Sequence, residues 1–424
     1  MTELDDGALA DLRSAGQVTS SRRAIEESLH ALRTLMGLDV AFVSRFREGR
    51  RRFEFVDSDP EYSPVRVGAS DPLEAAYCTR VVDGRIPPLV PDTSQLPATA
   101  DLAITHRLSI GSHVAVPLHG TDGVVVGTLG CFGRSAEPTL RARDLELVSV
   151  FAGLISRHMD IVFRHELEMT AVRANIEALI ENSFDIALQP IVELSSGRRA
   201  AFEALARFPP MPGTAGWTPD RWFREADRVG LGFALEAAAV EAAVSHLAHL
   251  PRSVNLSVNV SALALCGSEE VLRVVAGPHA PRLVVELTEH AEVRDYDELW
   301  SVLSLVRAAG ARIAVDDAGS GYAGLEHILR LQPEVLKLDR SLVEGVEEHR
   351  GRRAMCQAMV HFTRRMGSKL VAEGVETAAD LEALRELGVQ FAQGYLLGRP
   401  EVPARAGRHR DDGLDLLAGK PRAC

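Results

Sequence analysis

The segment IAVDDAGSGY, residues 313–322, decides the fold of the C-terminal half of this 424-residue chain. Residues 313–315 suit a buried strand, which ends in the adjacent carboxylates Asp316 and Asp317 and is followed by a glycine-rich loop. Buried charges without compensation cost several kcal/mol, so packing alone does not explain the pair. Divalent cations would offset the charge, and the pair therefore predicts a metal site at a strand tip. A solvated turn with ordinary acidic residues is the alternative.

Other strand-like runs in this half also carry side chains suited to metals or phosphates. They are Ala200–Phe208 with Glu203 and Arg207, Val254–Val260 with Asn259, Leu283–Glu289 with Glu286 and Glu289, Val335–Arg340 with Lys337 and Asp339, Lys369–Glu376 with Glu373 and Glu376, and Phe391–Leu397 with Gln393. Helix-like amphipathic stretches lie between them, namely Phe233–Leu250, Asp297–Ala309, Arg352–Met366 and Ala378–Leu387. Alternating strands and helices indicate a parallel sheet, and functional groups at many strand C-termini favour a (β/α)8 barrel.

Seven motifs within these runs carry a family resemblance. They are EALARF (203–208), SVNVS (257–261), ELTE (286–289), DDAGSGY (316–322), LKLDR (336–340), AEGVE (372–376) and QGYLLGRP (393–400). In this order, residues 184–400 resemble the EAL-domain phosphodiesterases of bacterial cyclic di-GMP signalling. That family has a modified barrel whose first strand is antiparallel to the second. Ile186–Glu193 and Arg199–Arg207, joined by a short Ser-Ser-Gly turn, fit such a hairpin.

The chemistry of phosphodiester hydrolysis suits these residue types. It needs an activated water and neutralised phosphoryl oxygens, which two metal ions about 3.5–4 Å apart supply together. Oxygen ligands favour the hard ions Mg²⁺ or Mn²⁺ over zinc. The resemblance implies two ligand sets that share one aspartate. The first is Glu203, Asn259, Glu286 and Asp316, and the second is Asp316, Asp317 and Glu373.

The resemblance also implies catalytic and substrate-binding groups. Lys337 would orient the water or handle its proton, Glu289 would brace the loop after the paired aspartates, and Glu376 would lie just outside the ligands. The substrate-facing group is Gln189, Arg207 and Gln393. A guanidinium suits a phosphate because it donates two parallel hydrogen bonds. Asp339 is open between plain solvation at a strand end and a structural or substrate role.

One position departs from the family pattern. Relatives usually have phenylalanine after the paired aspartates, whereas this chain has Ala318. The glycines Gly319 and Gly321 keep the backbone freedom of the loop. Since no metal ligand is lost, we expect reduced or more strongly regulated activity rather than none.

The first half predicts a separate sensor, since 424 residues suggest two or three domains. A helix at Ala24–Met36, strands at Val40–Phe46 and Arg52–Asp57, and a hairpin of His113–Leu118 and Val124–Phe132 resemble a GAF domain over residues 21–144. The ligand of this domain is unknown. Its cysteines Cys78 and Cys131 suit small buried apolar positions, with a redox pair as the alternative. Residues 1–20 and 401–424 have the composition of mobile tails.

A long helix is predicted to join the halves over residues 145–183. Apolar residues recur there at heptad spacing, with Val148, Ile155, Val162, Met169 and Ile176 on one line and Phe151, Val172 and Leu179 on another. This spacing is typical of a parallel coiled coil, and we expect a homodimer formed through the helix and the barrel. A single amphipathic helix lying on its own domain is the alternative.

The composition of the chain limits its expected cellular location and binding partners. A net charge of −12 gives a nucleic-acid polymer little electrostatic reason to bind. The chain has no apolar run of about 20 residues and no charged-then-apolar leader, so we expect a cytoplasmic protein without a membrane partner. Five cysteines without regular spacing fit a reducing compartment.

Two functions follow from the sequence. The first is a hydrolase that opens cyclic di-GMP to linear pGpG under control of the sensor. The second is a receptor that binds the same nucleotide without cleaving it. Receptor-type relatives usually lose acids at the metal positions, and this chain keeps them all, which favours the enzyme. No GGDEF-like motif of a synthase is present.

Overall fold

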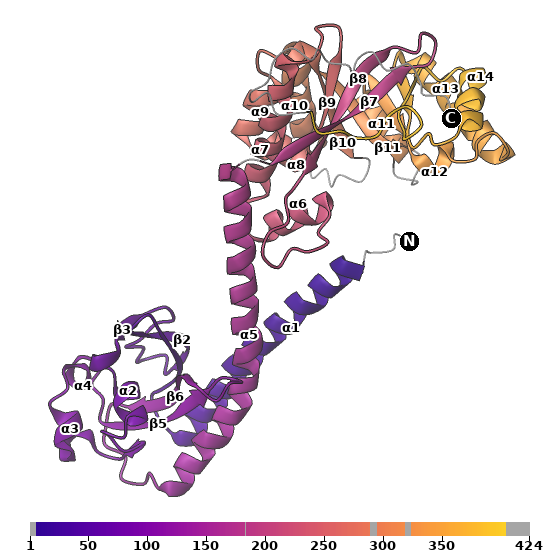
Figure 1. Ribbon diagram of the computed structural model, residues 1–424. Helices are drawn as coiled ribbons and strands as arrows, with labels where there is room; N and C mark the ends of the chain where they lie inside the picture. The colour runs from indigo at the N-terminus through magenta and orange to yellow at the C-terminus, as the bar shows by residue number, and fades with distance from the viewer. Residues whose placement is uncertain (1–5, 183, 289–294, 319–323, 404–424) are drawn as a thin grey trace. The chain divides into compact units, whose positions relative to one another are not determined.

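The computed structural model describes residues 6–182, 184–288, 295–318 and 324–403. The chain divides into two compact units, Met1–Thr170 and Ala171–Cys424 (Figure 1). Each unit has its own hydrophobic core. The helix α5 (Ala142–Asn182) contributes residues to both units.

The first unit is built on a six-stranded antiparallel sheet in the order β3-β2-β1-β6-β5-β4. The strands are β1 (Val40–Arg47), β2 (Arg50–Ser58), β3 (Ser70–Pro72), β4 (Leu89–Val90), β5 (Ser112–His119) and β6 (Val125–Gly133). The helices are α1 (Asp6–Met36), α2 (Tyr77–Val82), α3 (Pro97–Ala100), α4 (Ala103–Arg107) and α5. As predicted, β5 and β6 form a hairpin, and Gly123 turns its tip with a φ of 78°.

The two faces of this sheet carry different cores. α1 and α5 cover one face, where Ile25, Leu29 and Ile155 are buried. The segments from α2 to α4 cover the other face. Cys78 and Cys131 are free thiols in these separate cores, which explains them as buried apolar groups rather than a redox pair.

The predicted N-terminal tail is wrong from Asp6 onward, because helix α1 begins there. No proline interrupts residues 6–36, so a helix can continue through them. Farther along α1, Arg22 pairs with Glu166 of α5 at 2.7 Å.

The heptad pattern of α5 does not form an intermolecular seam over most of its length. Val148, Ile155 and Val162 are at most 1% exposed and lie in the core of the first unit. Ile176 and Leu179 lie in the core of the second. Side chains already buried in their own chain cannot also form the core of a dimer, so the coiled-coil prediction is wrong for them. The burial of these side chains favours the alternative, a single amphipathic helix lying on its own domain.

The second unit contains a closed eight-stranded barrel in the order β10-β11-β12-β13-β14-β7-β8-β9. Its strands are β7 (Asp185–Glu193), β8 (Arg199–Arg207), β9 (Asn255–Asn259), β10 (Leu283–Thr288), β11 (Arg312–Ala318), β12 (Val335–Leu338), β13 (Lys369–Ala372) and β14 (Phe391–Ala392). Its helices are α6 (Pro219–Arg228), α7 (Gly232–Ser245), α8 (Ala262–Gly267), α9 (Glu269–Val275), α10 (Tyr296–Ala308), α11 (Gly324–Leu331), α12 (Arg340–Val343), α13 (Arg350–Met366) and α14 (Ala378–Leu387). The predicted barrel is therefore confirmed.

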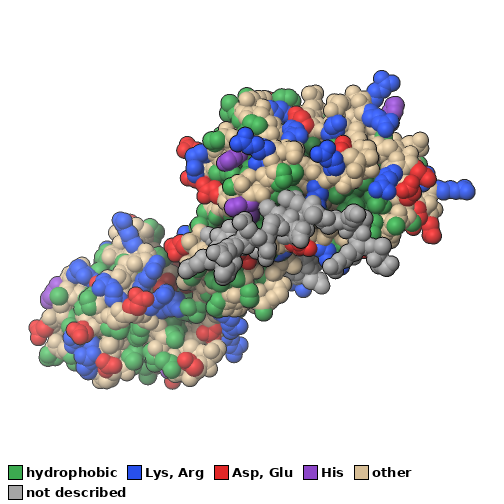
Figure 2. Space-filling view, turned by 45° about the horizontal axis from the view of Figure 1, so that its top comes forward, with side chains coloured by type: hydrophobic (Ala, Val, Ile, Leu, Met, Phe, Trp, Pro, Cys, Tyr) green, Lys and Arg blue, Asp and Glu red, His purple; other side chains and the backbone are tan. Residues whose placement is uncertain are grey.

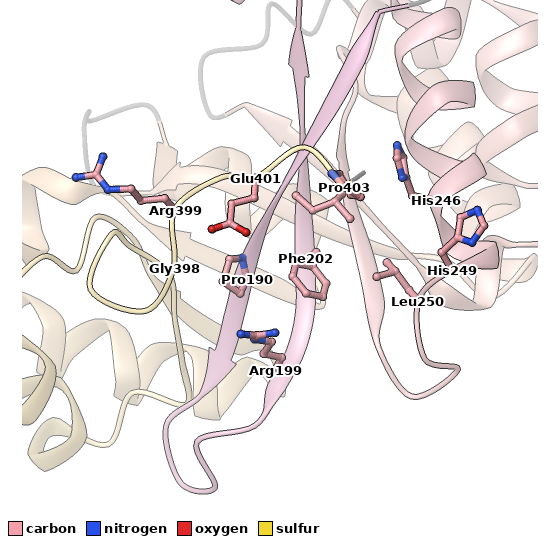
Figure 3. A pocket seen from close by; sticks show the side chains of 11 residues that line it. Pro190, Arg199, Phe202, His246, His249, Leu250, Gly398, Arg399, Glu401 and Pro403 are labelled. Carbon is pink, nitrogen blue, oxygen red and sulfur yellow. The ribbon is translucent and has the colours of Figure 1, made fainter. Parts of the chain in front are cut away.

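The barrel departs from a regular (β/α)8 fold at β7. This strand is antiparallel to both neighbours, β8 and β14, as the hairpin predicted. Because a hairpin joins β7 to β8, no helix follows β7. Instead, residues 398–401 run along the free edge of β7, and the chain then crosses its outer face to Pro403 (Figure 3). Glu401 exchanges two backbone hydrogen bonds with Leu188, so the chain is held there although a tail was predicted from residue 401. A cavity of about 160 Å³ lies on this outer face, lined by Pro190, Phe202 and His246 among others.

Two neighbouring substitutions in α5 test the packing of this helix. Ile155→Ala should lower the free energy of unfolding by about 2–5 kcal/mol, because it leaves a cavity in the core of the first unit. Leu154→Ala is the matched control, since Leu154 is 49% exposed, and should change stability by less than about 0.5 kcal/mol. Urea unfolding measures both. A loss of stability in Ile155→Ala that is accompanied by dissociation of a dimer would restore the intermolecular seam.

Candidate active site

The predicted ligands meet at one end of the barrel because its strands place them there. Side chains alternate between the two faces of a strand, so Glu203 of β8 points inward while its neighbour Phe202 packs outward. Asn259 at the end of β9 pairs in register with Glu286 of β10. Asp316 of β11 pairs with Thr288 of β10.

Lys337 of β12 lies at the centre of this cluster. Its side chain is 1% exposed, and its Nζ is 2.7 Å from Glu373, 2.9 Å from Glu286, 3.3 Å from Asp316 and 3.5 Å from Glu203. One ammonium group therefore contacts carboxylates from four different strands or strand ends. Burial opposes its charge, but attraction to these carboxylates outweighs burial and raises the pKa of Lys337 well above 10.5.

The pKa values of the carboxylates around Lys337 shift in different directions. Burial raises the pKa of Glu286 to about 8, with Lys337 opposing the shift and Glu203 and Asp316 adding to it. Burial likewise raises the pKa of Glu373 to about 8. The pKa of Glu203 is lowered, because Lys337 and hydrogen bonds from two amides outweigh its burial. The site thus holds more negative charge than its single ammonium group can neutralise.

The paired aspartates reach one site through an unusual backbone conformation. Consecutive side chains on a regular strand point to opposite faces. Asp317 has a φ of 56°, and the pairing of β11 with β12 is irregular between Val315 and Ala318. The strand therefore breaks its alternation at its tip. Oxygens of Asp316, Asp317 and Glu373 come within 4.8 Å of one another.

These oxygens form two candidate metal sites. A second group within the same limit consists of Glu203, Glu286 and Asp316, so Asp316 belongs to both. Among the described residues, the buried Oε1 of Glu286 has no hydrogen-bond partner. Buried polar atoms normally have one, so this oxygen suits a cation. An all-oxygen set fits Mg²⁺ or Mn²⁺.

Two amides hold the carboxylate of Glu203. Asn259 donates through Nδ2 to Oε1 at 3.1 Å, and Gln393 donates through Nε2 to Oε2 at 2.5 Å. Gln393 also donates to Gln189 at 3.0 Å, and Gln189 donates to the carbonyl of Gly398 at 3.2 Å. This chain of hydrogen bonds links the site to the segment that crosses β7.

The remaining predicted residues lie at varied distances from the cluster. Arg207 lines a cavity of about 200 Å³ beside Asn259 and donates to its neighbouring carbonyl, that of Ala206. Glu376 is half-exposed and pairs with Arg340 at 3.1 Å. Asp339 accepts a hydrogen bond from the amide of Ser341 and caps α12, which favours its structural role. Glu289 lies outside the described residues.

Sequence reasoning missed one partly buried carboxylate behind the site, that of Glu236. Glu236 of α7 accepts two hydrogen bonds from Ser261, two residues after Asn259. The sequence did contain a signal for Glu236. Glu236 falls on the helical stripe of Gly232, Leu235 and Val240, which is otherwise apolar and buried.

Models of known protein families match both units of the chain. A family model of the EAL domain matches residues 173–400, more than half of the chain. The chain belongs to the EAL-domain family. A second family model, of the GAF domain, matches residues 18–160.

Relatives of this EAL-domain protein have been named. Cyclic di-GMP phosphodiesterase NbdA of Pseudomonas aeruginosa is 32% identical over 260 residues, which cover 59% of this chain and 33% of NbdA. Probable cyclic di-GMP phosphodiesterase PdeB of Escherichia coli is 29% identical over 232 residues, covering 53% and 44% respectively. The solved structure of the PaMucR phosphodiesterase with c-di-GMP is 29% identical, with a TM-score of 0.49, and covers 55% of this chain and 98% of that one. The chain spans between 33% and 39% of the length of the first curated relatives.

The surface of the EAL-domain protein carries charges of both signs. On the face seen in Figure 2, acidic and basic side chains are interspersed. Among the described residues, no helix is both long and apolar enough to cross a membrane.

The raised pKa values of the two glutamates predict how stability depends on pH. Between about pH 5 and 8 the metal-free native state keeps protons on Glu286 and Glu373 that the unfolded chain, with ordinary values near 4.5, has released. The free energy of unfolding should therefore fall as pH rises through this window, by at most about 1.4 kcal/mol per pH unit for each group. Urea unfolding in EDTA measures the slope.

The control for this slope is a double variant, Glu286→Gln with Glu373→Gln. It removes both titrating groups, so its stability should depend less on pH than that of the unaltered protein. Equal slopes for the two proteins would show that these glutamates are not the source of the dependence.

Proposed function

We propose that this protein hydrolyses cyclic di-GMP to linear pGpG with two bound divalent cations, Mg²⁺ or Mn²⁺. The observation that carries the proposal is the complete set of oxygen ligands gathered around Lys337. Bound cations would supply an activated water and charge neutralisation at the phosphoryl oxygens. The names of the relatives support the choice of nucleotide.

The charge of the cluster supports the number of cations. Five carboxylates, those of Glu203, Glu286, Asp316, Asp317 and Glu373, together with one ammonium group give a net charge of −4 when all are ionised. Two divalent cations would neutralise this charge. We assign Glu203, Asn259, Glu286 and Asp316 to one cation and Asp316, Asp317 and Glu373 to the other.

Lys337 acts in this proposal as a fixed hydrogen-bond donor. In the metal-free cluster the surrounding carboxylates hold the pKa of Lys337 well above 10.5, so Nζ carries its proton there. It would orient the attacking water and offset charge among the carboxylates. It would not act as a base, because a general base must be unprotonated near the operating pH.

Substrate contacts belong to the residues along the mouth of the barrel. Arg207 can donate two parallel hydrogen bonds to a phosphate, and it lines a cavity together with Asn259. Gln189 and Gln393 would present amide groups to the water or the substrate. Glu289 and Glu376 would support the loops around the ligands.

Regulation by the GAF unit would pass through α5. This helix runs without a break from Ala142 to Asn182 and ends three residues before β7. A shift of α5 would reach the hairpin that carries Gln189 and Glu203. A homodimer through the barrel and a cytoplasmic location remain part of this proposal, whereas the seam on α5 does not.

A receptor that binds cyclic di-GMP without cleaving it is the second candidate. The departure at Ala318, in place of the usual aromatic residue, is the feature that favours it. Ala318 is fully buried at the end of β11. Turnover and binding measured together separate the two functions.

Removing the shared aspartate tests the hydrolase proposal. Purified full-length protein with Mn²⁺ should convert cyclic di-GMP to pGpG, detected by chromatographic separation of the nucleotides. Asp316→Asn should lower kcat/KM by about 10³-fold, because loss of both cation sites removes several kcal/mol of transition-state stabilisation.

Asp339→Asn is the matched control for this variant. Asparagine caps a helix about as well as aspartate, so α12 and the activity should be retained. Nucleotide that the unaltered protein binds but leaves intact would favour the receptor. Unchanged turnover in Asp316→Asn would contradict the assignment of the site.

A further inference from the structure

Glu236 and Ser261 form a polar clamp behind the candidate metal site. Glu236 projects from α7, and its Oε2 accepts a hydrogen bond from the Ser261 amide at 2.9 Å. Its Oε1 accepts one from the Ser261 hydroxyl at 2.8 Å. A single carboxylate therefore uses both of its oxygens on both donors of one residue. Charge-assisted hydrogen bonds of this kind are about twice as strong as neutral ones.

Ser261 in turn is fixed by the helix that follows it. Its Oγ accepts a hydrogen bond from the amide of Ala264 at 3.0 Å and so caps α8. The hydroxyl proton is then directed at Glu236 and the oxygen lone pair at α8. The position of Ser261 is therefore set from two sides, by α7 and by α8.

Asn259 lies two residues before this clamp and needs such support. Glu203 and Glu286 are buried, so packing restricts their side chains, whereas Asn259 is exposed. An exposed side chain loses rotamer freedom when it binds a cation, and that loss weakens binding. The amide of Val260 donates a hydrogen bond to the carbonyl of Glu286 at 3.0 Å, and Glu236 accepts hydrogen bonds from Ser261. The backbone on the C-terminal side of Asn259 is thus fixed at two successive residues.

We propose that Glu236 is a positioning residue for the cation site: by holding Ser261 it keeps Asn259 in place to bind the ion beside Glu203. This inference rests on the proposed two-cation function and assigns a role in it to a residue on a separate helix. Glu236 touches neither ligand nor substrate, so its effect should appear in cation affinity. Groups that orient metal ligands typically contribute about 10–100-fold to affinity.

Calorimetric titration of the full chain with Mn²⁺, without nucleotide, tests the role of Glu236. Glu236→Ala should weaken the binding of one of two ions by about 10–100-fold. The Mn²⁺ affinity of Glu236→Gln should lie between those of the unaltered protein and Glu236→Ala. The amide oxygen of glutamine can still accept a hydrogen bond from the Ser261 amide, but its nitrogen cannot accept one from the Ser261 hydroxyl. Glu236→Ala in an Asn259→Ala background should cause no further loss, because the effect acts through Asn259.

Glu334 provides a matched control. It makes the same kind of contact at the opposite end of the barrel, where it accepts hydrogen bonds from the Ile313 amide and from Arg307, each at 2.8 Å. Glu334→Ala should lower the melting temperature and leave Mn²⁺ affinity within about 2-fold, since it lies away from the ligands. If Glu236→Ala fails to fold, the Mn²⁺ affinities of Glu236→Gln and Ser261→Ala are measured in its place.

The outcomes separate this inference from the proposed function. Two bound ions in the unaltered protein, with the same affinities in Glu236→Ala, would overturn the positioning role and leave the function standing. Equal weakening by Glu334→Ala would also overturn it, because general loosening would then explain the effect. An unaltered protein that binds no Mn²⁺ would overturn both proposals.

Discussion

The ammonium group of Lys337 and the carboxylates around it are the constraint on which the second unit depends. Four carboxylates lie within 3.5 Å of one buried nitrogen. Removing either partner of a buried ion pair typically costs about 3–5 kcal/mol, because the remaining charge is left without compensation. The cluster can persist only because Lys337 comes from β12 while its partners come from β8, β10, β11 and the end of β13. A closed barrel is the arrangement that brings those strands to one axis.

The carboxylates of this cluster can hold either protons or cations. The pKa values near 8 of Glu286 and Glu373 mean that the metal-free cluster holds protons that an exposed glutamate would release. Divalent cations would take the place of those protons, so cation binding should become stronger as pH rises to about 8. The pKa of Glu203 is lowered instead, because attraction to Lys337 and hydrogen bonds from Gln393 and Asn259 together outweigh its burial. Glu203 is therefore ready to bind a cation before the other glutamates are.

The sequence predicted the barrel well because alternating strands and helices are local patterns, whereas the ligand set of the cluster followed from the family resemblance. A buried strand that ends in Asp316 and Asp317 is informative by itself, and the short turn between β7 and β8 predicted their antiparallel pairing. The heptad pattern of α5 was misleading for a physical reason. Residues such as Ile155 and Ile176 recur at the same spacing whether a helix packs on a second copy or on its own domains. Contacts between distant residues, such as Glu236 with Ser261 or Lys337 with four acids, depend on the tertiary fold and are not visible in either segment alone.

Electron paramagnetic resonance of the full chain titrated with Mn²⁺ tests the central claim most directly. The claim is that Asp316 belongs to two cation sites inside one cluster. The account predicts two Mn²⁺ ions per chain whose spectrum shows magnetic coupling, as expected for ions about 3.5–4 Å apart. A single ion per chain, or two ions with uncoupled spectra, would contradict it.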